Sequence, residues 1–244
     1  MKMQKMLSYL RRCVDDFDMI SEGDRIAVGI SGGKDSLALL VCLNALQKFY
    51  PRHFELAAVT VDLGFENLNL DGIRDFCKGC GIDYTVIPTQ IAQIVFEERK
   101  EENPCSLCSK MRKGTLNYYM REQGFNKVAY AHHRDDLVET LMMSMIYEGR
   151  LHSFSPVTYL EGIDMTIIRP FLYVPEPHII GFAKQMQLPV LKSPCPADGH
   201  TKREYIKQLI RQINTENPGA IDRMFHAACY GKLEGWPEVT DLNL

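Results

Sequence analysis

One glycine-rich segment carries the strongest chemical signal in the sequence. It follows a β-branched run, precedes a helical pattern, and consists of Ser31, Gly32, Gly33, Lys34, Asp35 and Ser36. Glycines let the backbone turn tightly, and the start of a helix presents unpaired N–H groups and a partial positive charge to an anion. A Walker A loop is excluded, because only two glycines precede Lys34 and because Asp35 stands where that loop has Ser or Thr. The segment predicts a phosphate cradle, and an incidental glycine-rich turn is the alternative.

Three cysteines form a second reactive group. Cys105 and Cys108 lie three residues apart ahead of a basic helical segment, and Cys195 stands much later between two prolines. Two thiolates at this spacing can bind one metal centre, and a third can reach it from elsewhere in a fold. Structural zinc prefers four protein ligands, whereas a cuboidal iron-sulfur cluster held by three cysteines keeps one iron free for a ligand such as hydrosulfide. The pattern therefore favours sulfur chemistry at a metal centre, although one Cys-x-x-Cys pair alone is a weak signal.

The other cysteines fit structural roles. Cys77 and Cys80 end a predicted helix with Gly81 as its C-cap, so this second Cys-x-x-Cys pair is expected away from the strand ends. The last three fall in helical patterns and are expected as small core residues: Cys13, Cys42 and Cys229.

A run of polar residues follows the fourth predicted strand, between Ala131 and Thr140. Asp136, Glu139 and Thr140 share one helical face, while Asp135 is placed to cap the helix. The plain alternative is a well-capped helix whose early acids suit the helix dipole, which accounts for one aspartate but not for the whole group. We expect Asp135 or Asp136 to position a cation or to move a proton.

These groups require a scaffold of alternating strands and helices. β-branched runs at residues 25–30, 55–61, 84–87, 127–131 and 165–168 predict strands. Amphipathic stretches predict helices at residues 35–46, 70–80, 106–123, 135–147 and 176–186. The alternation predicts an α/β fold, a Rossmann-like parallel sheet with helices on both faces, whose ligands collect at the carboxyl ends of the strands. Residues 148–164 are poorly periodic, with a hairpin turn suggested at Glu161-Gly162.

Bulk properties limit the remaining choices. At 244 residues we expect a single domain over 1–244, with an N-terminal helix and a C-terminal helical extension after Thr201. The chain has no long apolar run, and residues 1–20 lack the apolar core of a secretory signal, so we expect a cytoplasmic protein without a membrane partner. Eight cysteines without an export signal predict reduced thiols rather than a disulfide framework. A net charge of −3 still allows a local basic stripe for nucleic acid.

At all six positions the phosphate segment resembles the PP-loop of the ATP pyrophosphatase superfamily, whose fold is of the adenine nucleotide alpha hydrolase-like type. The resemblance implies an enzyme that cleaves ATP between its α- and β-phosphates and transfers AMP. It assigns the phosphates and Mg²⁺ to the segment from Ser31 to Ser36, and adenine to backbone groups around Val61. Arg169 resembles a family element near the phosphates, where it would stabilise the departing pyrophosphate.

The string from His132 to Thr140 resembles the second signature segment of the PP-loop enzymes that modify tRNA, which usually have Gly at the position of Ala131. Over most of the chain, the order of the motifs is similar to that of the tRNA 2-thiocytidine synthetase (tRNA-cytidine sulfurtransferase) family. The motifs follow one another as the PP-loop, the Cys-x-x-Cys pair with a basic helix, the acidic string and the late Pro-Cys. This resemblance implies a [4Fe-4S] cluster whose ligands are Cys105, Cys108 and Cys195.

The same resemblance implies an ATP-dependent sulfurtransferase. A cytidine oxygen of tRNA would attack the α-phosphate, pyrophosphate would leave with help from Mg²⁺ and Lys34, and sulfur would replace the activated oxygen. Arg112, one turn past Cys108, is expected to hold substrate or intermediate. A cysteine desulfurase or another sulfur donor is the implied partner, and relatives suggest a homodimer.

Basic residues on two predicted helices give the chain a surface for an RNA backbone: Lys110, Arg112, Lys113, Lys202, Arg203, Lys207 and Arg211. For the C-terminal four, a solvated helix face is the favoured interpretation when they are taken alone. Two other functions stay open: a PP-loop enzyme that thiolates or amidates a small molecule, and a non-catalytic ATP-binding or redox-sensing cluster protein.

Overall fold

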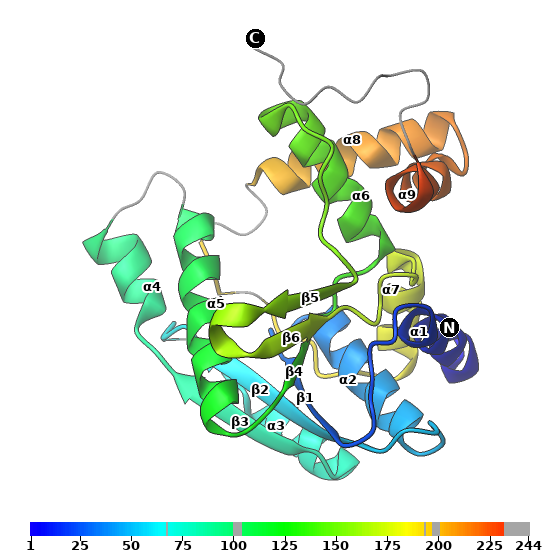
Figure 1. Ribbon diagram of the computed structural model, residues 1–244. Helices are drawn as coiled ribbons and strands as arrows, with labels where there is room; N and C mark the ends of the chain where they lie inside the picture. Colours follow the sequence, from blue (N-terminus) through cyan, green and yellow to red (C-terminus); the bar gives the residue numbers. More distant parts are fainter. Residues whose placement is uncertain (67, 100–103, 193, 197–200, 232–244) are drawn as a thin grey trace.

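The computed structural model describes residues 1–66, 68–99, 104–192, 194–196 and 201–231, so the end of the predicted 1–244 domain lies outside the described residues. Its centre is a six-stranded sheet of order β3-β2-β1-β4-β6-β5. The strands are β1 (Asp24–Gly29), β2 (Phe54–Asp62), β3 (Asp83–Pro88), β4 (Lys127–Ala129), β5 (Val157–Leu160) and β6 (Met165–Ile168). All neighbours pair in parallel except β5, which runs antiparallel to β6. The predicted α/β fold with a parallel sheet is confirmed, apart from the antiparallel edge strand β5 (Figure 1).

Helices cover both faces of the sheet, because side chains along β1 alternate between two apolar cores. Ile26 and Val28 belong to the core shared with α1 (Met3–Asp16), α2 (Lys34–Gln47), α3 (Asp71–Cys80) and α7 (Glu176–Gln185). Ala27 belongs to the core on the other face, with α4 (Ile91–Gln93), the π-helix η1 (Ile94–Glu98) and α5 (Pro104–Glu122). The two-residue period of a strand thus supplies both layers.

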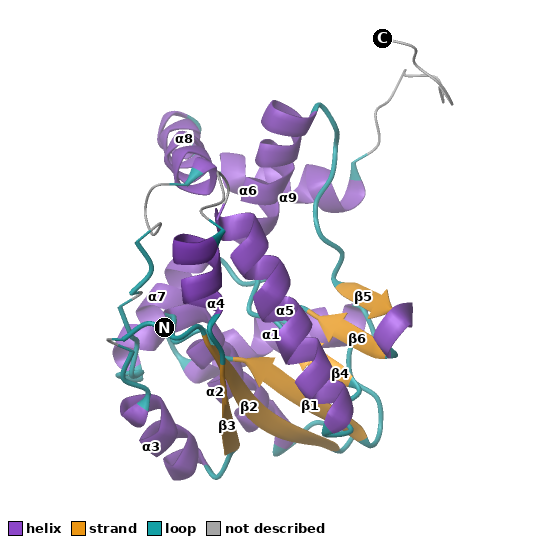
Figure 2. Ribbon diagram, turned by 90° about the vertical axis from the view of Figure 1, so that its left-hand side faces the viewer, coloured by secondary structure: helices purple, strands orange, loops and turns teal. Residues whose placement is uncertain are grey.

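Three further helices form a separate group beyond one end of the sheet. They are α6 (Arg134–Met143), continued by the π-helix η2 (Ser144–Glu148), together with α8 (Lys202–Glu216) and α9 (Ala220–Tyr230). A small apolar cluster of Val138, Ile206 and Ile210 joins α8 to α6. Figures 1 and 2 both place this group at the same end of the molecule, so α8 lies over the region where strand ends collect ligands. No helix in the described part of the chain is both long and apolar enough to cross a membrane.

The predicted strands and long helices agree with the structure to within a few residues. The hairpin turn suggested at Glu161-Gly162 is confirmed, since the 3₁₀ turn η3 (Glu161–Ile163) joins β5 to β6. The strand β5 itself, α4 and η1 were not predicted. These elements are only three to five residues long, which is too short for a period to show in the sequence.

Gly64 lies just after β2, between Leu63 and Phe65, two residues that line the cavity described below. Its φ is +86°, and a Cβ there would lie 2.6 Å from the carbonyl oxygen of Thr89. We expect Gly64→Ala to lower the free energy of unfolding by about 1–3 kcal/mol, because both the left-handed backbone and the close carbonyl oppose a side chain. Chemical denaturation measures the effect. Gly162→Ala is the matched control, since a Cβ at Gly162 meets nothing within 4 Å, and an equal loss there would contradict the explanation.

Candidate active site at the carboxyl ends of the strands

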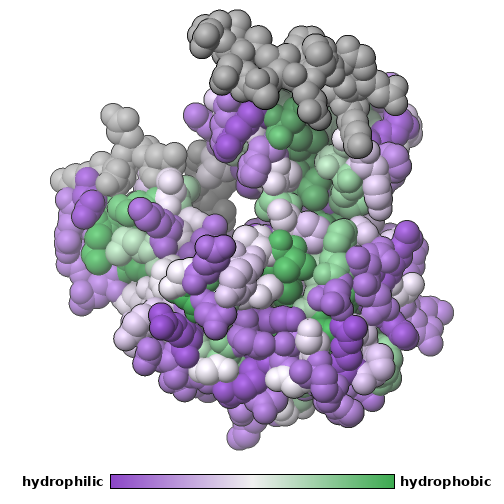
Figure 3. Space-filling model, in the orientation of Figure 1, coloured by the Kyte–Doolittle hydropathy of each residue, from purple (hydrophilic) through white to green (hydrophobic). Residues whose placement is uncertain are grey.

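A cavity of about 680 Å³ lies at the carboxyl ends of the central strands. The phosphate segment, the end of β2, the start of α5, the end of β4 and α8 all contribute to its wall. Figure 3 shows the surface hollowed between the side formed by α5 and the side formed by α6 and α8. Most of the predicted site residues line this cavity: Ser31, Gly33, Asp35, Ser36, Val61, Cys108, Arg112, Asp136 and Cys195.

The phosphate segment is held in its turn by its own hydroxyls. Ser36 Oγ accepts from the backbone N–H of Ser31 at 3.2 Å and donates to the Gly33 carbonyl at 3.1 Å. Gly32 has a φ of +81°, and Gly33 is the N-cap of α2 without a side-chain capping bond in the described structure. The first amides of α2 therefore remain available for an anion.

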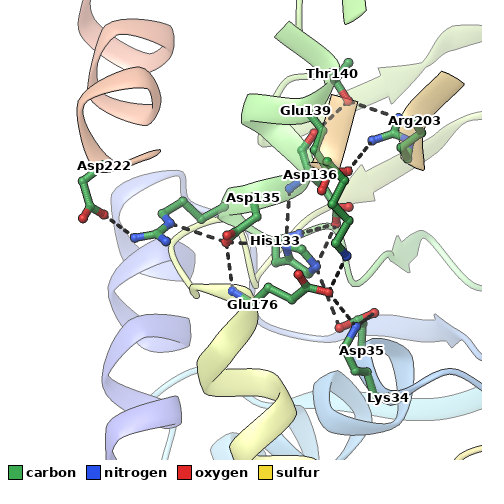
Figure 4. A network of polar contacts seen from close by, with 12 residues as sticks. Lys34, Asp35, His133, Asp135, Asp136, Glu139, Thr140, Glu176, Arg203 and Asp222 are labelled. Carbon is green, nitrogen blue, oxygen red and sulfur yellow. Dashed lines mark hydrogen bonds and ion pairs between the residues drawn. The ribbon is translucent and has the colours of Figure 1, made fainter. Parts of the chain in front are cut away.

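Lys34 begins α2 with its ammonium fixed by two carboxylates (Figure 4). Nζ lies 3.0 Å from Asp35 Oδ2 and 3.1 Å from Oε1 of Glu176, the first residue of α7. Burial lowers the pKa of Lys34, but Asp35 and Glu176 outweigh it and hold that pKa above its ordinary value. Lys34 is thus a fully charged cation beside the phosphate turn.

Asp35 and Asp136 approach each other across the buried imidazole of His133. Nε2 of His133 lies 3.9 Å from Asp35 Oδ1 and 3.5 Å from Asp136 Oδ2. Asp35 Oδ1 is buried and has no hydrogen-bond partner among the described residues. Two cavity-lining carboxylates, one with an unpaired oxygen, are a donor set that suits Mg²⁺.

The expectation that Asp135 caps α6 is wrong. The N-cap is His133, whose side chain accepts from the Asp136 N–H while Asp136 Oδ2 accepts from the His133 N–H. Asp135 lies inside α6, and its carboxylate accepts from the backbone N–H of Glu176 at 2.9 Å. The helix rotation between adjacent residues separates the two aspartates, so Asp136 reaches the cavity wall and Asp135 the start of α7.

Two basic residues of α8 do more than face solvent, because they pair with carboxylates of the site, although Arg203 is itself 44% exposed. Arg203 lines the cavity and donates to Glu139 Oε2 at 3.2 Å and to Thr140 Oγ1 at 3.3 Å. Lys207 donates to Glu176 Oε1 at 2.7 Å. Sequence reasoning also missed Glu176, whose only signal was an acid in the first turn of a predicted helix, a position that the helix dipole alone explains.

Arg169 does not reach the cavity as described, contrary to its predicted place near the phosphates. Its guanidinium donates to Ser155 O at 2.6 Å and to Thr158 Oγ1 at 3.1 Å, and lies over the Phe154 ring. Phe154 in turn packs against His132, with ring centroids 4.8 Å apart. Since the side chain extends toward the edge strand β5, Arg169 supports the wall from behind.

Two of the three predicted cluster ligands, Cys108 and Cys195, lie on the cavity wall, and Cys105 is exposed one helical turn before Cys108. Burial raises the pKa of the Cys108 thiol and the Arg112 guanidinium opposes this rise, while Cys195 and Cys105 are near enough to add to it. Within the described ranges, no three His, Cys, Asp or Glu side chains lie close enough together to hold a metal ion. The thiols are therefore neighbours at one end of the cavity without forming a ready-made metal site.

The remaining cysteines lie where structural roles were predicted. Cys77 is buried in the core near the end of α3, and Gly81 follows as a left-handed C-cap with a φ of 69°. Cys13 and Cys42 are buried, and Cys229 is partly buried against the same core.

Comparison with known proteins defines the family. A family model described as a PP-loop domain matches residues 3–213. A tRNA-cytidine(32) 2-sulfurtransferase of Legionella pneumophila is 38% identical over 226 residues, which cover 92% of this chain and 80% of that protein. The chain belongs to this PP-loop family of tRNA-cytidine 2-sulfurtransferases. A Geobacter metallireducens family member with the same name is 37% identical over 227 residues, covering 92% of this chain and 88% of its own.

Solved structures agree on the fold of the family. The U34-tRNA thiolase NcsA from Methanococcus maripaludis, solved with its [4Fe-4S] cluster, superposes with a TM-score of 0.76 at 24% identity, covering 92% of this chain and 76% of that one. An NH₃-dependent NAD synthetase from Campylobacter jejuni gives a TM-score of 0.54 at 17% identity, covering 99% and 100%. At these identities the likeness is one of fold.

His132 gives the site a measurable pH dependence. Burial, partly opposed by Asp136, lowers its pKa from 6.5 to about 4. Between these values the unfolded chain binds more protons than the folded one, so stability falls as the pH falls through this window, by up to roughly 3 kcal/mol. We expect His132→Asn to flatten the dependence measured by urea unfolding at pH 4 to 7. His152→Asn, at an exposed histidine, serves as control, and an unchanged slope in His132→Asn would contradict this origin.

Proposed function

We propose that this protein is an ATP-dependent tRNA sulfurtransferase, which adenylates a cytidine carbonyl oxygen with release of pyrophosphate and replaces that oxygen with sulfur to form 2-thiocytidine. The observation that carries the proposal is one cavity wall shared by the phosphate turn and the Cys108–Cys195 thiols. Activation by ATP and delivery of sulfur must meet at one carbon atom, so the two sets of groups must face the same space. Family membership supports the same reaction.

The chain's own residues account for the adenylation step. A carbonyl oxygen is a poor leaving group, and its attack on the α-phosphate converts it into an adenylate that leaves as AMP. Developing charge on the pyrophosphate meets the α2 amides and the Lys34 ammonium, which are held in place before ATP binds. Mg²⁺ bound between Asp35 and Asp136 would neutralise further phosphate charge, and backbone groups around Val61 would receive adenine.

On the sulfur side of the cavity, Cys105, Cys108 and Cys195 are the residues that would hold a [4Fe-4S] cluster, although they do not form a ready-made metal site in the described structure. Three thiols from two segments are neighbours there, and thiolate is the ligand that iron-sulfur clusters use. When bound, such a cluster would offer one iron without a protein ligand as the carrier of the incoming sulfur. Arg112 lines the cavity one turn past Cys108, where its guanidinium favours the thiolate form and would hold the anionic adenylate.

The proposed substrate is a cytidine in tRNA, which is the substrate that the names of the sequence relatives state. Arg112 and Lys113 on α5 and Arg203 on α8 line the cavity, and Lys110 is exposed on α5. All four would contact the RNA backbone. A cytoplasmic cysteine desulfurase or another sulfur donor would supply the sulfur, and a homodimer is the proposed assembly.

Deleting the gene from its source strain is expected to remove 2-thiocytidine from tRNA, as measured by mass spectrometry of nucleosides. The intact gene should restore the nucleoside, whereas Cys105→Ala and Lys34→Ala should not, because one loses a cluster ligand and the other the phosphate-binding ammonium.

Cys80→Ala is the matched control, since it removes a thiol from the other Cys-x-x-Cys pair, and it should restore 2-thiocytidine fully. An unchanged nucleoside profile in the deletion strain would count against tRNA as the substrate and direct the search to small molecules. Absence of pyrophosphate release from the purified protein with its substrate would favour a sensor.

The two aspartates should separate by measurement. Asp136→Asn is expected to reduce pyrophosphate release by about 10²-fold or more with little change in melting temperature, since asparagine keeps the capping oxygen but not the charge for Mg²⁺. Asp135→Ala is expected to act mainly on stability, because it removes the oxygen that accepts from the Glu176 N–H. Thermal denaturation and a pyrophosphate assay on both variants test the assignment, and the reverse pattern would refute it.

A further inference from the structure

Glu176 is a buried carboxylate with an unusual set of partners. Its side chain is 10% exposed. One of its two oxygens, Oε1, contacts both lysines, with Lys207 Nζ at 2.7 Å and Lys34 Nζ at 3.1 Å. Burial alone would raise its pKa, but the two lysines outweigh burial and lower the pKa to about 2. A carboxylate in this position therefore stays charged at neutral pH and offsets the repulsion between the two ammonium groups that contact it.

On one side, Glu176 fixes the direction of the phosphate-binding lysine. A lysine ammonium has three N–H donors on a flexible four-carbon stem. Asp35 Oδ2 at 3.0 Å and Glu176 Oε1 at 3.1 Å take two of these donors, which leaves the third for a phosphate oxygen. Fixing the stem before ATP binds also removes part of the rotamer entropy that binding would otherwise cost.

On the other side, Glu176 anchors α8. Lys207 donates to Glu176 and belongs to the same helix as Arg203. The Arg203 guanidinium donates to Glu139 and Thr140 at the cavity wall (Figure 4). Ile206 and Ile210 of the same helix also pack in an apolar cluster with Val138 of α6. Through one oxygen, the phosphate turn near the start of the chain is thus tied to a helix 173 residues further along, from Lys34 to Lys207.

We propose that Glu176 is a positioning residue of the ATP site, which aims the Lys34 ammonium at the β- and γ-phosphates and, through Lys207, ties α8 to the phosphate turn. The inference rests on the proposed use of ATP at this site. AMP lacks the phosphates that Lys34 would bind, so loss of Glu176 should affect ATP and AMP differently.

The first test compares dissociation constants for MgATP and AMP by calorimetry on the full chain. Glu176→Gln is expected to weaken ATP binding about tenfold or more and AMP binding less than about twofold. Glu55→Gln is the matched control, because Glu55 also pairs with a cation, Arg25, but at the start of β2 and 71% exposed. If the wild type binds ATP more tightly than AMP and Glu176→Gln binds ATP as tightly as the wild type, this inference is overturned and the proposed function is not. A wild type without that preference would overturn the proposed function as well.

Two further variants exclude a merely structural role. If Glu176 acts through Lys34, Glu176→Gln should add little to the loss of ATP affinity in Lys34→Ala, and fully additive losses would overturn the inference. Lys207→Met should increase hydrogen exchange in α8 at least several-fold while reducing ATP affinity less than Glu176→Gln does. Unchanged exchange in α8 would overturn the tie between that helix and the phosphate turn.

Discussion

The reversal of strand order beside β1 is the constraint on which the site depends. From β1 the chain builds the sheet outward through β2 and β3 on one side, and then returns to place β4 on the other side. Where the strand order reverses in this way, the connections from the two neighbouring strands run in opposite directions and leave a crevice at the carboxyl ends of the strands. The phosphate turn leaves from β1 and the His133–Asp136 cap follows β4, so the topology alone brings these two segments together.

Within that crevice, polar and charged side chains pair with one another. Glu176 lies between two lysines, Glu139 accepts from Arg203, and His133 lies between Asp35 and Asp136. The buried carboxylates of Glu176 and Glu139 would be costly to bury alone, since an isolated charge loses its hydration in the interior. This pairing explains why a chain of net charge −3 can present several cations to a polyphosphate.

The phosphate turn and the thiols of Cys108 and Cys195 share the cavity because α5 packs against the sheet face beside the phosphate turn. Leu116 and Met120 of α5 pack into the core of that face, which fixes the helix and sets Cys108 and Arg112 on the wall. A Cβ at Gly29 would come 3.2 Å from the ring of Tyr130 and 3.4 Å from the side chain of Leu116 in α5. A small residue at the end of β1 therefore allows the close approach of the two halves of the site.

The sequence by itself determined the elements and residues whose signals are local. The phosphate turn, the sheet, the Cys105–Cys108 pair and the structural role of Cys77 could be predicted, because turn glycines, strand periods and cysteine spacing act over a few residues. The antiparallel strand β5 could not, since four residues at a sheet edge show no period.

Only the tertiary structure decided which charged side chains face the cavity. Asp135 and Asp136 are adjacent in sequence but point to different partners, Arg169 turns toward β5, and Arg203 and Lys207 turn inward from a helix that looked solvated. Glu176 carried no motif at all, and its role depends on Lys34 and Lys207, which are far from it in sequence. The physical reason is that a long-range ion pair exists only once packing has brought its partners together, and no local pattern encodes that distance.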